Sequence, residues 1–179
     1  MRKLIVLSSM LLAWSASIPA GDIALGAAPP AADVPRVEFA FEERVTIAAP
    51  VVMGETMLGH RQYIPITGGT VAGPKLEGEV LPGGWDFQLT HAGGKCTQLS
   101  ADYFLKADDG TVIHVLNEGL FCHGARGIFR PRLEAPNGKH GWLTNATFLA
   151  TLEIEAPKAR EGSSTPAVEA VRIRFYQVL

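Results

Sequence analysis

Residues 97–117 constrain the fold more than any other part of the chain, because their pattern specifies two paired strands. Apolar and polar residues alternate on both sides of residues 108–110, and a period of two is typical of a strand with one buried face. The sequence Asp-Asp-Gly at 108–110 suits a three-residue hairpin loop in which the glycine is left-handed. The register set by this loop places Tyr103 beside Val115, so both strands turn their apolar residues to one face.

The same register makes a prediction about the two cysteines of the chain. With Ala107 paired to Thr111 and no bulge on either strand, Cys96 lies directly opposite Cys122. Opposed residues of an antiparallel pair have Cα atoms roughly 4.5–5.5 Å apart, a spacing that a disulfide tolerates. We therefore expect a Cys96–Cys122 bridge. A bulge at Gly119 would shift the register, and two unpaired thiols remain the alternative.

Alternation of period two recurs along most of the chain after residue 35. Further strands are expected at 36–47, 61–66, 75–81, 85–90, 128–133, 142–153 and 168–178. The chain contains 19 glycines and 12 prolines, which favour turns over long helices. About eight strands with hairpin-length connections predict an all-β chain. The expected architecture is a single closed antiparallel up-and-down β-barrel.

Glycines within the expected strands mark bends and turns. The sequence Thr-Gly-Gly-Thr at 67–70 predicts a bulge or a sharp bend. Gly83 and Gly84 predict a two-residue turn between the strands at 75–81 and 85–90, which pairs Val80 with Phe87. Residues 51–60 and 156–166 are expected to be loops.

The first 20 residues have the pattern of an export signal. Arg2 and Lys3 precede a short apolar run at 4–14, and small residues follow up to Ala20. A retained membrane anchor is the alternative, but a spanning helix needs about 20 apolar residues. We expect a protein exported to the periplasm or the extracellular space, where an oxidising environment favours the bridge. The expected organisation is a signal peptide at 1–20, a flexible leader at 21–35 and a β-barrel domain at 36–179.

Charge and motifs exclude several classes of function. The chain has 16 basic and 18 acidic residues, which argues against a nucleic-acid partner. The sequence has no Gly-x-Ser-x-Gly, phosphate-loop, dinucleotide-binding or His-Glu-x-x-His motif, and its five histidines form no close ligand pair. We therefore expect no cofactor, no metal and no stable membrane insertion. The sequence leaves open whether the chain forms a homo-oligomer.

One carboxyl group is expected inside the barrel. Glu43 falls on the apolar parity of its strand, between Phe41 and Val45. Burial would raise the pKa of this carboxyl, which is how a general acid or base is made. The alternatives are a bulge that turns Glu43 outward, or a partner such as Arg172 or Arg174.

Asn117 lies on the same expected face as Tyr103 and Val115, which should line the barrel. A buried amide needs hydrogen-bond partners, so Asn117 either bonds a neighbouring strand or orients a ligand in the barrel mouth. Asp86 and Asp102 have the opposite parity to Phe87 and Tyr103. They would line the lumen only if the lumen were polar.

Four stretches of sequence resemble a known family. They read Ile-Pro-Ile-Thr-Gly-Gly-Thr at 64–70, Gly-Pro-Lys-Leu-Glu-Gly-Glu-Val-Leu-Pro-Gly-Gly at 73–84, Ala-Asp-Asp-Gly at 107–110 and Asn-Glu-Gly at 117–119. They look like the domain-of-unknown-function family 3237, also called uncharacterised protein family 0311, and the resemblance extends over residues 39–178. It implies a closed antiparallel barrel and no settled reaction. The chain departs from the family pattern at Phe87, where tryptophan is usual, and at Thr144, where asparagine is usual.

Two hypotheses for function come from these observations. The first is an exported barrel that holds a small apolar or aromatic molecule in its mouth, since barrels of this size can hold one ligand. Its candidate binding residues are Asn117, Tyr103, Trp85 and Trp142, although the two tryptophans could equally be core or rim residues. The second is a cofactor-independent lyase or isomerase in which a carboxylate moves a proton. Its candidates are Glu43, Asp86 and Asp102.

Overall fold

The computed structural model describes residues 26, 28–91, 93–122, 127–155 and 168–179. The chain divides into two units, Met1–Val34 and Pro35–Leu179. In the first unit, the described residues contain one turn of 3₁₀ helix, η1 (Ala31–Asp33). The expected signal peptide, most of residues 21–27 of the expected leader and the expected loop at 156–166 lie outside the described residues. Within the described part of the chain, no helix is long and apolar enough to cross a membrane.

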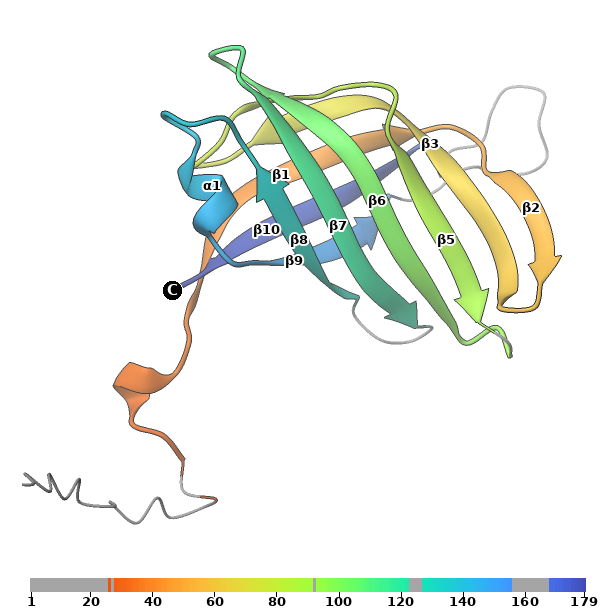
Figure 1. The fold of residues 1–179 in the computed structure, drawn as a ribbon, viewed down its shortest axis with the longest axis horizontal. Helices are drawn as coiled ribbons and strands as arrows, with labels where there is room; N and C mark the ends of the chain where they lie inside the picture. Colours follow the sequence, from red (N-terminus) through yellow and green to blue (C-terminus); the bar gives the residue numbers. More distant parts are fainter. Residues whose placement is uncertain (1–25, 27, 92, 123–126, 156–167) are drawn as a thin grey trace, which may run out of the picture. The chain divides into compact units, whose positions relative to one another are not determined.

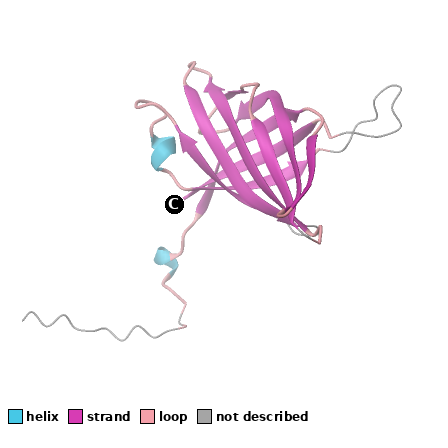
Figure 2. Cartoon of the chain, turned by 45° about the vertical axis from the view of Figure 1, so that its right-hand side comes forward, coloured by secondary structure: helices cyan, strands magenta, loops and turns pink. Residues whose placement is uncertain are grey.

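The second unit is a closed antiparallel β-barrel (Figures 1 and 2). Its sheet runs in the order β1-β10-β9-β8-β7-β6-β4-β3-β2, and pairing of β1 with β3 closes the barrel. The structure confirms the expected all-β fold and eight-stranded barrel, with two additional strands among the described residues. The strands are β1 (Val37–Ile47), β2 (Val51–Thr56), β3 (Gly59–Ala72), β4 (Gly78–Val80), β5 (Trp85–His91), β6 (Cys96–Ala107), β7 (Val112–Cys122), β8 (Ile128–Glu134), β9 (Phe148–Ile154) and β10 (Ala170–Val178).

β4 and β5 share one position in the barrel, and the expected hairpin between them is wrong. Both strands lie between β3 and β6: Val80 pairs with Gly69 and Leu105, while Phe87 pairs with Tyr63 and Ser100. β3 and β6 are long, so two short strands in line satisfy more of their backbone groups than one short hairpin would.

Two other expected segments also differ from the structure. Residues 51–60 were expected to form a loop, but they contain β2, which pairs with β3. The expected strand at 142–153 begins instead as a short helix, α1 (Trp142–Asn145), and its strand starts at Phe148. Trp142 and Ala146 are four residues apart, a spacing that fits a helical turn as well as an alternating strand. The pattern alone therefore could not separate the two.

The bend expected at 67–70 is present in β3. The register between β1 and β3 shifts there, because Thr46 pairs with Gly68 while Ile47 pairs with Ile66. Gly69 has a φ of 150°, and a Cβ atom at this position would collide with the carbonyl oxygen of Arg44. The shift lets apolar residues on both sides of the bend point into the barrel.

The β6–β7 hairpin has the predicted register without a shift. Tyr103 pairs with Val115, and Cys96 pairs with Cys122. The predicted disulfide between these cysteines is confirmed, and their Cα atoms are 4.1 Å apart.

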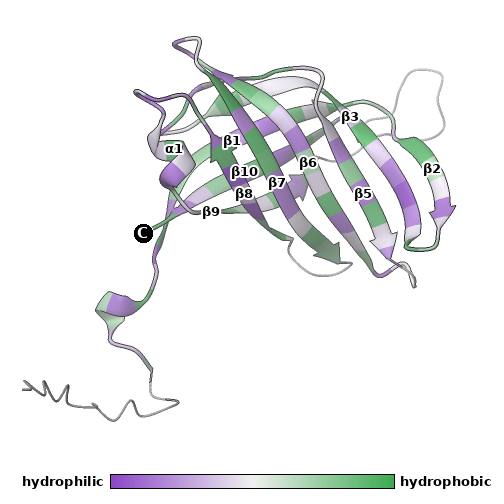
Figure 3. Ribbon diagram, viewed as in Figure 1, coloured by the Kyte–Doolittle hydropathy of each residue, from purple (hydrophilic) through white to green (hydrophobic). Residues whose placement is uncertain are grey.

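Apolar and polar residues alternate along most barrel strands (Figure 3), which turns the apolar set inward. One end of the interior is filled by side chains. There, the ring of Phe41 stacks on Phe175 at 4.4 Å and meets the edge of Phe148 at 6.4 Å. Leu143 from α1 is completely buried in the same core cluster. The other end is hollow.

Candidate functional site

A cavity of about 340 Å³ occupies the hollow end of the barrel. It lies where β1, β7 and β9 end and where β6, β8 and β10 begin, and a cavity of this size suits one small molecule. Most of its wall is apolar. The described residues that line it are Val45, Ile47, Ile64, Ile66, Asp86, Gln88, Thr97, Leu99, Ala101, Tyr103, Asn117, Phe121, Phe129, Leu152, Ile154, Val168, Val171 and Ile173.

A hydrogen bond across the lumen forms the inner end of the cavity. The Tyr103 hydroxyl on β6 donates to Glu43 Oε2 on β1 at 2.7 Å, although these two strands are not neighbours. Tyr103 lines the cavity, as does Val45, which follows Glu43 by two residues. Phe41 precedes Glu43 by two residues and packs in the filled end. The Glu43–Tyr103 pair therefore separates the filled core from the cavity.

Glu43 is completely buried, on the inward face that its position in the sequence predicts. Burial raises the pKa of this carboxyl to about 8, and the hydrogen bond from Tyr103 opposes part of that rise. Glu43 Oε1 has no hydrogen-bond partner among the described residues. Near neutral pH this group is mainly protonated, so it can donate or accept a proton close to the pH of the cell.

The expected arginine partners of Glu43 bind other carboxylates. Arg172 donates to Glu42 at 2.8 Å, and Arg174 lies 2.7 Å from the same carboxylate and 3.1 Å from Glu153. These alternatives for Glu43 were therefore wrong. Glu42 has the opposite parity on β1, so its arginine network belongs to the outer face of the barrel.

Asn117 lines the cavity from β7 and is 3% exposed. Its position inside the barrel is the one that the hairpin register predicts. Asn117 Oδ1 is buried and accepts no hydrogen bond from the described residues. Because an unmet buried acceptor lowers stability, this atom is suited to receive a donor from a bound molecule.

Asp86 lines the cavity from β5, with Gln88 beside it. Asp86 accepts hydrogen bonds from the Ser100 backbone nitrogen at 3.2 Å and from Gln88 Nε2 at 2.8 Å, and Gln88 in turn accepts one from Gln62 at 2.7 Å. Burial raises the pKa of Asp86 to about 6, although these hydrogen bonds lower it. The expectation that the Phe87 face of this strand points inward was wrong, because β5 turns its polar face to the lumen.

Three of the expected site residues lie away from the cavity. Trp85 is on the outward face of β5, 46% exposed and packed against Phe87. Asp102 is on the outward face of β6 and bonds His114 Nε2 at 2.8 Å. Trp142 belongs to α1, where its ring packs on Phe148. These three are therefore not candidates for contact with a molecule in the cavity.

Four lining residues, Gln88, Thr97, Phe121 and Phe129, were not among the residues expected to form the site. For three of them a signal existed, since Gln88 has the parity of Asp86, Thr97 that of Tyr103, and Phe121 that of Asn117. That these residues and Phe129 face one space is shown only by the closed arrangement of the strands.

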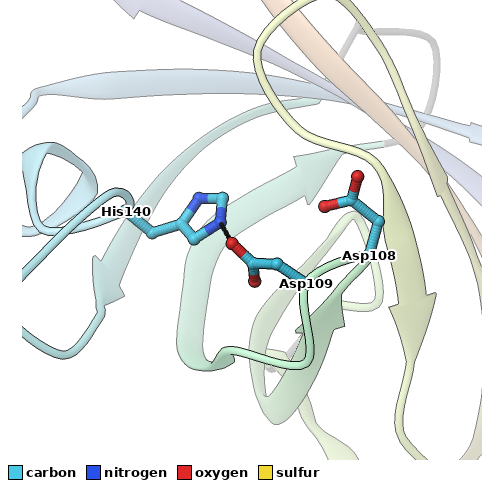
Figure 4. A group of neighbouring side chains, drawn as sticks. All are labelled: Asp108, Asp109 and His140. Carbon is cyan, nitrogen blue, oxygen red and sulfur yellow. Dashed lines mark hydrogen bonds and ion pairs between the residues drawn. The ribbon is translucent and has the colours of Figure 1, made fainter.

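A separate cluster of polar side chains lies at the β6–β7 loop (Figure 4). His140 Nε2 is 2.9 Å from Asp109 Oδ2, and Asp108 is the third member. The ammonium of Lys139 already lies 3.2 Å from Asp109 and 3.7 Å from Asp108. Hydrogen bonds from Thr111 and from the two basic side chains hold the pKa of Asp109 below its usual range. The cluster therefore joins the hairpin loop to the segment before α1.

Comparisons with known proteins give a consistent result. Residues 35–128 match the family described as "Protein of unknown function (DUF3237)". A UPF0311 protein of Clostridium acetobutylicum is 34% identical over an alignment of 159 residues, and the match covers 79% of this chain and 92% of that protein. A UPF0311 protein of Rhodopseudomonas palustris, RPA1785, is 37% identical over 159 residues, covering 79% and 95%.

Solved structures share the fold. The crystal structure of RPA1785 aligns with a TM-score of 0.68 at 29% identity and covers 82% of this chain and 99% of that chain. A structure described as an enzyme from Penicillium herquei aligns with a TM-score of 0.62 at 22% identity, covering 87% and 100%. At that identity, the second similarity shows the fold alone.

Proposed function

The chain belongs to the DUF3237 family, also called UPF0311, and from this premise we propose that it is an exported barrel that binds one small, mainly apolar molecule in its cavity. The observation that carries the proposal is Asn117, which lines a hollow, mainly apolar space and whose buried Oδ1 accepts no hydrogen bond from the described residues. Pockets for small molecules combine a mostly apolar wall with a few placed polar groups, and this cavity has that composition.

Binding can be tested with N-phenyl-1-naphthylamine, a neutral dye whose fluorescence rises in apolar surroundings. Ala101→Phe places a ring inside the cavity, whereas Gln98→Phe places the same ring on the exposed face of the same strand. We expect the wild type and Gln98→Phe to bind the dye, and Ala101→Phe to lose at least tenfold in affinity. Equal binding by all three proteins would contradict the proposed site.

Export is supported by the sequence pattern of residues 1–20 and by the Cys96–Cys122 disulfide, which suits an oxidising compartment. Cell fractionation followed by N-terminal sequencing tests it. We expect a soluble envelope or secreted protein that begins near Gly21 or Ala28. Cytoplasmic protein that retains Met1 would contradict export.

A second candidate function is a cofactor-independent lyase or isomerase. Two observations favour it: Glu43 and Asp86 both have raised pKa values at the cavity, and a protein of the same fold is described as an enzyme. Asp86 contacts the cavity directly, while Glu43 reaches it through the Tyr103 hydroxyl. Ionised Asp86 could take a proton from a bound molecule and return it to another atom of that molecule, and protonated Glu43 could supply a proton through the Tyr103 hydroxyl.

Deuterium exchange distinguishes catalysis from binding. A molecule that co-purifies with the protein is identified by mass spectrometry and incubated with it in D₂O. An enzyme that removes a proton from carbon would add deuterium to that molecule, and Asp86→Asn or Glu43→Gln would stop the exchange. If the wild type retains the molecule but no deuterium is exchanged, the enzyme function is contradicted and only the binding function remains.

A further inference from the structure

Two hydrogen-bond acceptors lie in one row across the cavity wall. Asp86 on β5 pairs with Ala101 on β6, and Ala101 pairs with Asn117 on β7. All three side chains line the cavity. Neighbouring strands are about 4.8 Å apart, so the Cα atoms of Asp86 and Asn117 are separated by about 10 Å. Only the methyl group of Ala101 lies between them, which leaves room for part of a ligand.

Both acceptors have unused capacity. The two oxygens of Asp86 each accept one hydrogen bond, from Ser100 and from Gln88, but a carboxylate can accept about four. Asn117 Oδ1 accepts none from the described residues. The side chains of Asp86 and Asn117 therefore line the cavity on either side of Ala101, and the row is suited to a group that carries several donors.

The charge of the cavity has one sign. Among the described residues that line it, the ionisable side chains are Asp86 and Tyr103, and none is a lysine, an arginine or a histidine. An anionic head group at the row would face a carboxylate in an apolar environment, where repulsion is stronger than in water. A protonated amine would instead pair with the carboxylate and donate to the amide oxygen.

We propose that the molecule bound in this cavity is a compact apolar amine whose protonated nitrogen lies over Ala101, between Asp86 and Asn117. The inference rests on the proposed binding function and names its ligand class. The apolar part of the molecule then fills the space bounded by the aliphatic residues of β9 and β10 and by Phe121 and Phe129.

The test uses three probes with one ring system and different head groups: 1-naphthylmethylamine, 1-naphthalenemethanol and 1-naphthoate. Each displaces N-phenyl-1-naphthylamine from the protein at pH 7.5, where Asp86 is mainly ionised because its pKa is about 6. We expect the amine to bind at least tenfold more tightly than the alcohol, and the naphthoate not to compete. Equal competition by the naphthoate and the amine would overturn the inference.

Two variants test whether the preference for the amine depends on Asp86 in this row. Asp86→Asn should lose the advantage of the amine over the alcohol, measured as the ratio of their two affinities. Asp102→Asn makes the same change on the outward face and should leave the preference intact. Retention of the amine preference by Asp86→Asn would overturn the inference.

Failure of the two proposals is distinguishable. If the wild type does not bind the neutral dye or any naphthalene probe, the proposed binding function fails. If it binds the dye and the alcohol but shows no preference for the amine, only the ligand class is wrong.

Discussion

The Glu43→Gln substitution tests whether the buried carboxyl controls how the stability of the barrel depends on pH. Glutamine has the shape of protonated glutamate, keeps an oxygen that can accept the Tyr103 hydroxyl, and does not ionise. In the wild type, burial raises the pKa of Glu43 from 4.5 to about 8. The folded protein therefore retains this proton over a range of pH in which the unfolded chain has released it.

The sign and size of the effect follow from these two pKa values. Below pH 4.5 both states hold the proton, and the stability linked to it is fully present. As the pH rises toward 8, each unit lowers the free energy of unfolding of the wild type by up to about 1.4 kcal/mol. From pH 5 to pH 9 the wild type loses about 4 kcal/mol of its free energy of unfolding through this group. Glu43→Gln does not have this loss, because glutamine does not ionise.

Urea unfolding of the oxidised proteins at pH 5, 7 and 9 measures this difference. We expect the free energy of unfolding of Glu43→Gln, relative to that of the wild type, to be about 4 kcal/mol higher at pH 9 than at pH 5. Asp86 contributes equally to the pH dependence of both proteins, so its contribution cancels in the difference between them. Glu77→Gln is the control, because Glu77 is exposed, and its curve should parallel that of the wild type. The reasoning is refuted if Glu43→Gln also runs parallel to the wild type.

Three further changes have defined outcomes. Tyr103→Phe leaves the buried carboxyl without its donor and should lower the free energy of unfolding at pH 6 by roughly 1–3 kcal/mol in urea titrations. Replacing Cys96 and Cys122 together with alanine opens a loop of 26 residues and should cost roughly 3–4 kcal/mol, while thiol titration of the denatured wild type should detect no free thiol. Gly119→Ala brings a Cβ atom against the ring of Phe129, so thermal unfolding should show a loss of roughly 1–3 kcal/mol and dye titration a weaker affinity.

The sequence predicted the β6–β7 hairpin well because the information there is local. A short loop fixes the register, and alternation then assigns every side chain of both strands to a face. The disulfide and the inward positions of Tyr103 and Asn117 depend on that register alone. Glu43 was placed inside by the same parity argument, but its partner Tyr103 lies 60 positions away and no local pattern shows it.

The arrangement of β4 and β5 depends on distant partners, so their sequence could not reveal it. Two glycines at 83–84 fit a tight hairpin turn as well as they fit a bulge within one barrel position. The choice is decided by the unpaired edges of β3 and β6, which accept both short strands in line. The same long-range pairing decides which face of β5 points inward, and therefore whether Asp86 belongs to the cavity.

The orientation of β5 is itself informative about function. Asp86 and Gln88 point inward, while Trp85 and Phe87 lie on the outer face next to Tyr63. Burial of the two aromatic rings would release more free energy than burial of a carboxyl and an amide. A chain selected for stability alone would therefore reverse this strand. Departures from the local rule are expected where a site needs polar groups in its interior, and β5 contributes one end of the acceptor row in the cavity.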